Sequence, residues 1–383
     1  MSRRERGDGS VFQRQTGKRA GQWVAQLDLG WSAKGRHYKQ FTGATQREVL
    51  EKLQKARNEQ SRGALAYGPR QTVAQYLEYW LEHTVEPNLR PSTHASYEIS
   101  IRLHILPVLG RLQLTKLSPQ HLEAFLNDRR KTAGLAPRTV QYLHAILRSA
   151  LSDAMYREIV SRNVAKLVKA PRVTREEITP LSPEDAVRFL AAVKGDRLEA
   201  LYSVALAVGL RRGEALGLQW EDIDLDAAMM HIRKALQSVG GVLTLVDVKS
   251  RTSNRSIPLP AFAVRALRQH KRRQIEERLA AGPAWKDTGY VFTTAHGTPL
   301  DGRNVLRYFQ GILERAEIPK KRFHDLRHTC ASLLLAQGEH PRAVMELLGH
   351  SQISLTMNTY SHVFPSVLRG AADKMDELLG NGS

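Results

Sequence analysis

Four separated segments in the second half of the sequence carry polar side chains whose types suit chemistry on a phosphate group. In the first segment, Gly209 lets the backbone turn and Arg211 follows two residues later. The planar fork of an arginine suits bidentate contact with phosphate oxygens. We expect Arg211 to lie at the start of a helix with its guanidinium free. Taken alone, the same pattern is typical of a surface arginine in a helix–turn segment.

The second and third segments add a lysine and a histidine–arginine pair. Lys249 lies in Val248–Arg251, which we expect to be a hairpin tip that directs the lysine toward a ligand, although hairpin tips are often basic. His324 and Arg327 are three residues apart, so on a helix they share a face and could meet one phosphate. His328 lacks the carboxylate of an HExxH zinc motif, and a buried, hydrogen-bonded histidine is the better interpretation of it.

The fourth segment holds a histidine and a tyrosine near the C-terminal end. Gly349 is expected to end a helix, with His350 just beyond it and Tyr360 ten residues further on. We place Tyr360 on a short helix or turn. A lone tyrosine there would usually be a half-buried packing residue, so the chemical interpretation of this segment depends on the other three.

Residues 1–65 are predicted to form a small domain of three strands and one helix. Thr45 and Glu48 make a capping box that predicts where the helix begins. Residues 1–70 hold fifteen Lys or Arg and six Asp or Glu, about half of the net charge of the chain. Such a sheet can enter the major groove of DNA, although its basic face could also be merely solvated. The expected strands are Ser10–Arg14, Trp23–Leu29 and His37–Phe41.

Residues 71–165 are predicted to form an all-helical bundle, which follows a linker near Ala64–Arg70. Thr72 and Gln75 make a capping box for its first helix. The last helix has one apolar face, at Val140, Leu143, Leu147, Ala150, Leu151 and Ala154. The later helices are expected at Ser92–Ile105, from Ser118-Pro119 onward, and at Pro137–Tyr156.

Basic side chains of this bundle could face phosphates, although a solvated helix face is the commoner role for each one alone. They are Arg138, His144, Arg148 and Lys169. The segment Ala165–Pro180 is basic and only lightly apolar, and we interpret it as an interdomain linker.

Residues 175–383 are predicted to form a mixed α+β domain that begins with a helix at Ser182-Pro183-Glu184-Asp185. The chain as a whole is therefore expected to be multidomain and mainly α, with small β-sheets. Apolar residues at helical spacing in Ser366–Leu379 predict a tail helix, packed either on a neighbouring protomer or back on its own domain. A strand-rich insertion is expected at Met230–Ala235, Leu243–Val248 and Arg255–Leu259, with its first turn at Gly240-Gly241.

Composition narrows the class of protein. A formal net charge of +19 over 383 residues favours an acidic partner, and nucleic acid is the commonest one. A basic surface that only aids solubility, or association with ribosomes, are the alternatives. The single cysteine, Cys330, excludes an internal disulfide framework and a multi-cysteine zinc site. No apolar run is long enough for a membrane helix and no secretory signal opens the chain, so we expect a cytoplasmic protein.

The ordered combination of the four segments resembles the tyrosine recombinases, the phage-type integrase family. The matching strings are Gly-Leu-Arg-Arg-Gly-Glu, His-Asp-Leu-Arg-His-Thr, Leu-Leu-Gly-His-Ser and Thr-Tyr-Ser-His. The resemblance covers the whole chain: the first segment looks like the arm-site DNA-binding domain of lambda-type integrases, and the helical middle is similar to a core-site-binding domain. Integrases of temperate phages or integrative elements of Gram-positive or actinobacterial hosts look closest.

The resemblance implies a role for each polar residue. Arg211 and Arg327 would clamp the scissile phosphate, and Lys249 would protonate the leaving 5′ oxygen. His324 and His350 would hydrogen-bond the phosphate and help manage the proton of Tyr360, the nucleophile. Tyr360 lies ten positions after His350, whereas in many members of the family the tyrosine lies nine positions after this histidine. The implied enzyme needs no cofactor and no metal, because positive side chains stabilise the charge and a phosphotyrosine stores the energy of the broken bond.

The resemblance also implies partners: double-stranded DNA with core-type and arm-type attachment sites, and a homotetramer on two DNA sites joined as a Holliday junction. An excisionase and a host DNA-bending protein are plausible accessories. Integration, and with it excision, of a phage or mobile-element genome is the expected function. A DNA-binding regulator that has lost catalysis and a relaxing topoisomerase of the related tyrosine type are the alternatives. The first is disfavoured because all six polar positions are filled, and the second because of the N-terminal basic domain.

Overall fold

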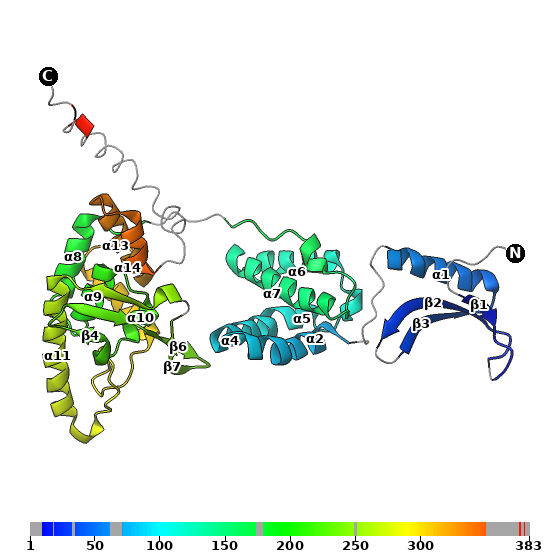
Figure 1. The fold of residues 1–383 in the computed structure, drawn as a ribbon, viewed down its shortest axis with the longest axis horizontal. Helices are drawn as coiled ribbons and strands as arrows, with labels where there is room; N and C mark the ends of the chain where they lie inside the picture. The colour runs from blue at the N-terminus through cyan, green and yellow to red at the C-terminus, as the bar shows by residue number, and fades with distance from the viewer. Residues whose placement is uncertain are drawn as a thin grey trace. The chain divides into compact units, whose positions relative to one another are not determined.

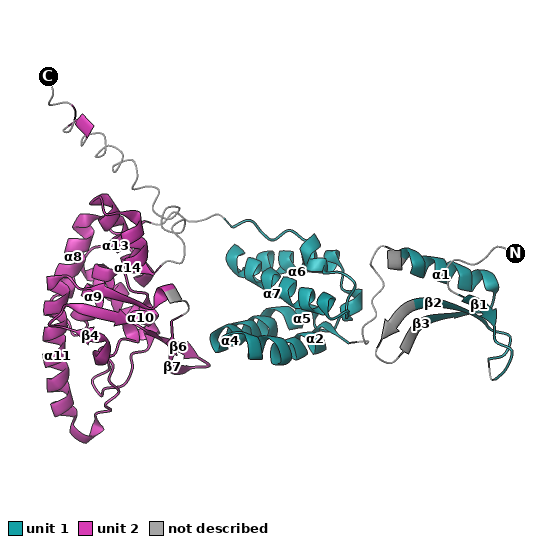
Figure 2. Ribbon diagram, viewed as in Figure 1, with its two compact units in different colours: residues 1–174 teal, residues 175–383 magenta. Residues whose placement is uncertain are grey.

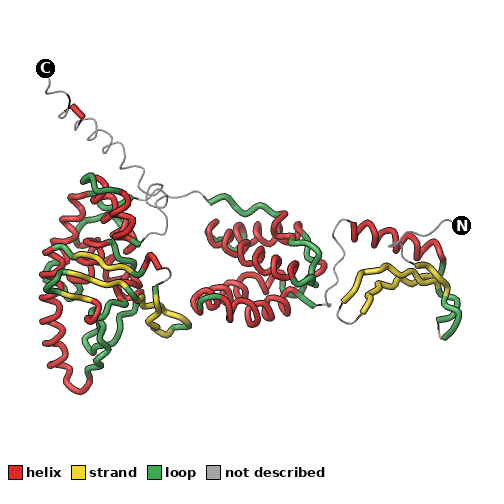
Figure 3. The backbone as a smooth tube through the Cα atoms, in the orientation of Figure 1, coloured by secondary structure: helices red, strands yellow, loops and turns green. Residues whose placement is uncertain are grey.

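The structure, a computed structural model, is described for residues 10–17, 19–32, 35–61, 71–173, 179–248 and 251–349, and for 375, 376 and 379. The chain divides into two compact units, residues 1–174 and 175–383 (Figure 2). Helices predominate in the second part of the first unit and in the second unit, and the strands gather in small sheets (Figure 3). The expectation of a mainly α fold with small sheets is confirmed. Within the described residues, no helix combines the length and apolarity needed to cross a bilayer.

The first part of unit 1 is an antiparallel three-stranded sheet covered by one helix (Figure 1). The helix α1 begins as predicted, because the Glu48 backbone N–H donates to Thr45 Oγ1 at 3.3 Å. The Glu48 carboxylate accepts from the Ala44 N–H at 3.0 Å and not from that of Thr45. Buried Ala25, Leu27, Val49, Leu53 and Ala56 form the small core between sheet and helix. The bounds are β1 Ser10–Gln13, β2 Trp23–Ser32, β3 Gly35–Gly43 and α1 Gln46–Ser61, in the order β1-β2-β3.

The second part of unit 1 is a helical bundle with its own hydrophobic core. The predicted Thr72–Gln75 capping box is present, and Ser118 caps the helix that begins at Pro119. Two π-helical turns interrupt the helices, at Leu81–Val85 and Ile101–Ile105. The α-helices are α2 Val73–Trp80, α3 Glu86–Asn88, α4 Pro91–Ser100, α5 Leu106–Leu109, α6 Pro119–Lys131 and α7 Pro137–Tyr156, with short 3₁₀ turns at Leu114–Lys116 and Val164–Leu167.

The helix α7 is the centre of this bundle, and its predicted apolar face is buried at all six positions. Two polar contacts tie α2 to it: Tyr76 Oη donates to the Ala150 carbonyl at 2.7 Å, and Trp80 Nε1 donates to Asp153 Oδ2 at 2.6 Å.

The predicted linker at Ala165–Pro180 begins too early. Ala165 and Val168 are buried in the bundle core, and the Ala165 carbonyl accepts a hydrogen bond from His144 Nε2 at 2.9 Å. His144 is therefore a buried structural residue of the bundle and does not face solvent. The predicted linker at Ala64–Arg70 lies outside the described residues, which begin again at Gln71.

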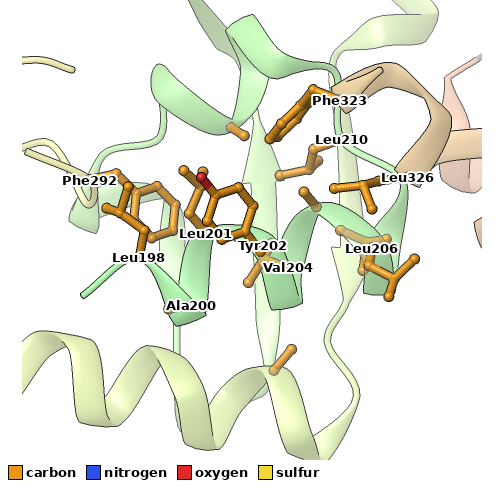
Figure 4. Close-up of a cluster of buried hydrophobic side chains, with 14 of the residues drawn as sticks. Leu198, Ala200, Leu201, Tyr202, Val204, Leu206, Leu210, Phe292, Phe323 and Leu326 are labelled. Carbon is orange, nitrogen blue, oxygen red and sulfur yellow. The ribbon is translucent and has the colours of Figure 1, made fainter. Parts of the chain in front are cut away.

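Unit 2 is built around α9, whose side chains are buried on nearly every side. A helix that is apolar all round belongs at the centre of a fold. Tyr202 of α9 packs against Phe309, with ring centroids 5.8 Å apart. It also packs against Phe323, at 6.3 Å, within a cluster of buried apolar side chains (Figure 4). The helix α8 starts as predicted, because Ser182 Oγ accepts from the Asp185 N–H. The helices are α8 Pro183–Val193, α9 Glu199–Val208, α10 Arg212–Leu216, α11 Ala261–Ala281, α12 Gly302–Arg315, α13 Phe323–Ala336 and α14 Pro341–Leu348.

The strand-rich insertion differs from the prediction in its pairing. The expected first strand, Met230–Ala235, is divided between two sheets: one part pairs with β4 and β8, the other begins a hairpin that turns at Gly240-Gly241 as predicted. The strands before and after Lys249 therefore lie in different sheets, so they do not pair as the hairpin that was expected around Val248–Arg251. The bounds are β4 Ile223–Asp224, β5 Met229–Ile232, β6 Lys234–Val239, β7 Val242–Asp247 and β8 Arg255–Pro258.

Candidate active site

The turn between α9 and α10 holds the first candidate residue. Gly209 ends α9 in the left-handed region, with φ of +64°, where a side chain is disfavoured. It also packs closely, since a Cβ on Gly209 would lie 2.4 Å from Leu348 Cδ2 of α14. The end of α14 therefore packs closely against the turn that precedes Arg211.

Arg211 lies at the start of α10, as predicted, but its guanidinium is not free. Its Nη1 donates to Glu214 Oε1 at 2.5 Å, and its Nη2 donates to the Gly349 carbonyl at 3.3 Å. Its backbone N–H also donates to the Glu214 carboxylate, at 3.1 Å. The side chain is 38% exposed, so it is fixed at its base while part of it remains open to a ligand.

Glu214 is the buried carboxylate of this site, with a side chain only 3% exposed. It accepts from two arginines, Arg211 and Arg255. Burial raises the pKa of Glu214, but the two guanidiniums, Arg255 more than Arg211, outweigh it, so that the pKa lies below its ordinary value. The carboxylate is therefore ionised. Arg255 is not among the residues predicted from the sequence to act at this site.

Arg327 comes to the same turn from α13. It is almost fully buried, at 1% exposed, and its Nη1 donates to the Gly209 carbonyl at 2.8 Å. Next to it, Cys330 lies under α9, with its Sγ 3.4 Å from the Ala207 carbonyl. Arg327 therefore contacts the turn that leads directly into Arg211.

His324, at the start of α13, faces solvent more than Arg327 does. Its pKa is lowered, first by partial desolvation of the ring and then by the positive charges of Arg327 and Arg211. At neutral pH the imidazole is therefore uncharged and can accept a proton. The three described candidates, Arg211, His324 and Arg327, are brought together, because both arginines act electrostatically on this histidine.

His328 lies one turn after His324, with the two rings 4.8 Å apart in an edge-to-face contact. Burial, followed by the effect of His324, lowers the pKa of His328 to about 4. The side chain is 9% exposed. These facts fit the predicted structural role of His328. Among the described residues, no group of three or more His, Cys, Asp or Glu is placed to hold a metal.

Lys249, His350 and Tyr360 lie outside the described residues, as does almost all of the predicted tail helix. The chain is described on both sides of Lys249 and up to Gly349. Gly349 directly precedes His350, and its carbonyl accepts from Arg211. Gly349 ends α14 in the left-handed region, as predicted.

A cleft of about 820 Å³ adjoins His324. It is lined by residues of α10, of α12 and of the start of α13, and most of its charged side chains are basic. Lys321 of this cleft donates through Nζ to the Thr179 carbonyl at 2.8 Å. The cationic residues that line the cleft are Arg212, Lys320, Lys321 and Arg322.

Comparison with known proteins shows the family of this chain. The sequence profile of the phage integrase family matches residues 180–366, and that of the phage integrase N-terminal SAM-like domain matches residues 72–129. An integrase of Streptomyces ambofaciens is 31% identical, over 99% of this chain and 98% of that protein. The chain belongs to the phage integrase family. As a member of that family of tyrosine recombinases, it is a site-specific DNA recombinase.

Solved structures of other integrases share the fold. The Tn1549 transposon integrase, in complex with a circular intermediate DNA, matches 79% of this chain and 99% of its own with a TM-score of 0.68 and 22% identity. A lambda integrase tetramer bound to a Holliday junction matches 93% of this chain and 96% of its own, with a TM-score of 0.56 and 17% identity. The phage integrase family member described here therefore has the architecture of these enzymes in both of its helical parts.

Proposed function

We propose that this recombinase cleaves and rejoins DNA through a covalent bond between Tyr360 and a backbone phosphate. The observation that supports the proposal most strongly is that two arginines meet at this site: Arg327 donates to the Gly209 carbonyl, and Arg211 donates to the Gly349 carbonyl. Both arginines also act electrostatically on His324. Two fixed cations beside a neutral histidine suit the binding of an anion, such as a phosphate, that a nucleophile then attacks.

The first requirement of the reaction is to stabilise negative charge. A phosphodiester is anionic and repels nucleophiles, and further negative charge develops on its nonbridging oxygens in the transition state. Arg211 and Arg327 stabilise that charge. A phenol has a pKa of about 10, so the Tyr360 hydroxyl must lose its proton as it attacks phosphorus. His324, whose pKa is lowered by burial and then by the two arginines, can accept this proton or hydrogen-bond the phosphate, together with His350.

The bond from phosphorus to the 5′ oxygen breaks as the bond from Tyr360 to phosphorus forms. Lys249 protonates the leaving 5′ oxygen, and the product is a 3′-phosphotyrosine with a free 5′ hydroxyl. Attack of a 5′ hydroxyl from the partner strand reverses these steps and joins the new strands, so no energy source is consumed. Exchange of two strands gives a Holliday junction, and exchange of the other two resolves it.

The remaining parts of the chain are assigned to DNA binding. Residues 71–165 would bind the core-type site: a pocket of about 430 Å³ on the bundle is lined by Arg138, Arg148 and Lys166, which suit phosphates. Residues 1–65 would bind arm-type sites through the basic sheet. Residues 175–383 hold the chemistry.

A homotetramer would assemble on two DNA sites in the cytoplasm, because four strands are cut; the lambda integrase tetramer on a Holliday junction is the precedent. An excisionase and a host DNA-bending protein would set the direction of the reaction. The element moved would be a phage or integrative-element genome.

The test uses overlapping nicked duplexes that tile the DNA on each side of the gene. A nick a few nucleotides to the 3′ side of the scissile phosphate lets the short fragment with the free 5′ hydroxyl diffuse away. The reverse reaction is then lost, and the covalent adduct accumulates. Wild-type protein should form an adduct with one duplex, and peptide mapping should place it on Tyr360. The matched variant Tyr360→Phe should bind the same duplex and form no adduct. Attachment at any other residue would contradict the proposal.

A second assay addresses the topoisomerase alternative. Wild-type protein is incubated with a supercoiled plasmid that lacks the reactive duplex sequence, and with one that carries it. Recombination between two plasmids that carry the sequence supports the proposal. Relaxation that is equally fast without the sequence would favour the topoisomerase.

A further inference from the structure

Arg255 is the most deeply buried cation near the candidate site that the proposed chemistry does not use. Its side chain is 7% exposed, and each of its three nitrogens donates to a different element. Nε donates to the Leu347 carbonyl at the end of α14 at 2.7 Å, Nη1 to the Ser253 carbonyl at 3.0 Å, and Nη2 to Glu214 Oε2 at 3.1 Å.

These three contacts join the elements that precede or follow the candidate residues. Glu214 holds Arg211 through two hydrogen bonds. The packing is tight, because a Cβ on Gly349 would lie 2.8 Å from the Thr252 carbonyl and 3.0 Å from Arg255 Nη1. Arg255 is therefore enclosed between α10, α14 and the turn before β8.

The charges around Glu214 show why a second arginine is needed. One buried carboxylate with Arg211 alone would form a neutral pair, and a neutral pair attracts a phosphate weakly. A second guanidinium leaves the group with one net positive charge. The Arg255 side chain is 7% exposed and the Arg211 side chain is 38% exposed. The net positive charge of the group can therefore act on a ligand through Arg211.

We propose that Arg255 is a positioning residue for DNA cleavage: it neutralises Glu214 and thereby leaves the charge of Arg211 available to the scissile phosphate. This inference rests on the proposed function. Arg255 does not touch the DNA; it acts through Glu214 and Arg211, and it holds the end of α14 in place at the same time.

The experiment measures the single-turnover rate of adduct formation on the nicked duplex that reacts with wild-type protein. Arg255→Gln should slow the adduct by about 100-fold, comparable to the loss of one transition-state donor. Its affinity for the uncut duplex should stay near that of wild type. Arg255→Lys keeps the charge and should stay within about tenfold of the wild-type rate, because an ammonium still neutralises Glu214.

The decisive variant is the double substitution Arg255→Gln/Glu214→Gln. Removing the carboxylate restores the net charge of the group, so the double variant should cleave at least about tenfold faster than Arg255→Gln, a coupling that a double-mutant cycle measures. A residue that only supports the fold would give a double variant no faster than the single one, and that result would overturn the inference.

The matched control is Arg197→Gln. Arg197 is likewise a guanidinium that joins elements of unit 2, through Glu277 and the Thr293 carbonyl, but away from the Gly209 turn. Its adduct rate should be close to wild type in the folded protein. If Arg255→Gln does not fold, a 100-fold loss in folded Arg255→Lys with normal DNA affinity would still overturn the charge argument.

The outcomes also separate the inference from the function on which it rests. If wild-type protein forms no adduct on any duplex, or if Tyr360→Phe still forms one, the proposed function fails and the inference falls with it. If Tyr360→Phe is inactive and Arg255→Gln cleaves as fast as wild type, the inference alone fails.

Discussion

The helical bundle and unit 2 differ sharply in what they bury. Among the described residues, the bundle buries two polar side chains, His144 and Asn163. Both are bonded within the bundle: His144 to the Ala165 carbonyl, and Asn163 to the Arg148 carbonyl and to Ser152 Oγ. Among its own described residues, unit 2 buries twelve polar side chains: Ser203, Glu214, Asp222, Ser253, His270, Gln274, Thr293, Asp325, Arg327, His328, Thr329 and Ser332.

The difference reflects what each region must do. Burying a charge costs free energy even when it is paired, so a region that needs charge only on its surface can dispense with buried charge. Unit 2 retains Glu214 and Arg327 at this cost, and both contact the Gly209 turn or the residue that follows it. Two of the buried charged residues of unit 2 thus lie where a phosphate would be held, while the bundle keeps its cations on the surface.

The largest expected effect is on the rate of DNA cleavage, and it should distinguish an arginine proposed to act in catalysis from one proposed to bind DNA. Arg327→Ala should slow adduct formation by about 100- to 1000-fold, because a fixed cation beside the phosphate is lost. Arg148→Ala, on the bundle surface, should leave the rate of bound protein unchanged and lower the slope of affinity against salt concentration by about one. Single-turnover rates and a salt titration measure the two. If Arg327→Ala and Arg148→Ala slowed cleavage equally, the proposed division of roles between unit 2 and the bundle would be wrong.

The next prediction concerns the two hydrophobic cores. Leu143 of α7 and Leu201 of α9 are both fully buried. Leu143→Ala and Leu201→Ala should each reduce the free energy of unfolding by about 2–5 kcal/mol, through lost transfer free energy and a cavity. Calorimetry should show each variant lowering the transition of its own unit alone. A shift of both transitions by one variant would mean that the units unfold together.

Acid should weaken unit 2 before the bundle. His328 has a pKa near 4 in the folded chain and about 6.5 when unfolded, so the unfolded state binds more protons between these values. Stability should therefore be full above pH 6.5 and fall as the pH drops toward 4, by at most about 3 kcal/mol from this residue. His270 and His324 act in the same direction, because their pKa values are also lowered.

Thermal melts at steps of pH measure this effect. His328→Gln should flatten the dependence between pH 6.5 and 4 for unit 2, with no change for the bundle. A dependence of the same slope in the variant would assign the acid sensitivity to other groups.

The smallest effect should be common to both regions. Thr72 and Ser182 cap α2 and α8 through their side-chain oxygens. Thr72→Ala and Ser182→Ala should each cost about 1 kcal/mol of the free energy of unfolding of its own unit. Chemical denaturation measures both. A much larger loss at either position would indicate a role beyond capping.

The sequence predicted most reliably the features that depend on near neighbours. The bounds of α7, the caps at Thr72, Ser118 and Ser182, the turn at Gly209 and the glycine end of α14 all follow from spacing within one or two helical turns. The grouping of Arg211, His324 and Arg327 came from the resemblance to a family, since more than a hundred residues separate the first from the others.

The errors have one physical origin, which is that a partner far along the chain decides the structure. The run Met230–Ala235 looks like one strand, because local propensity does not show that its two parts pair with different sheets. Ala165 and Val168 are buried by contacts with helices that come earlier in the chain. Arg255 was missed because its partners Glu214 and Leu347 are 41 and 92 residues away.

The position of the single cysteine has a practical consequence for studying assembly. Cys330 is buried beneath α9, and burial raises the pKa of its thiol to about 12. Reagents that attack the thiolate will therefore pass over it in the folded chain. A fluorophore can be attached to one engineered surface cysteine without replacing the native one, so energy transfer between labelled protomers can follow synapsis in real time on an otherwise unaltered enzyme.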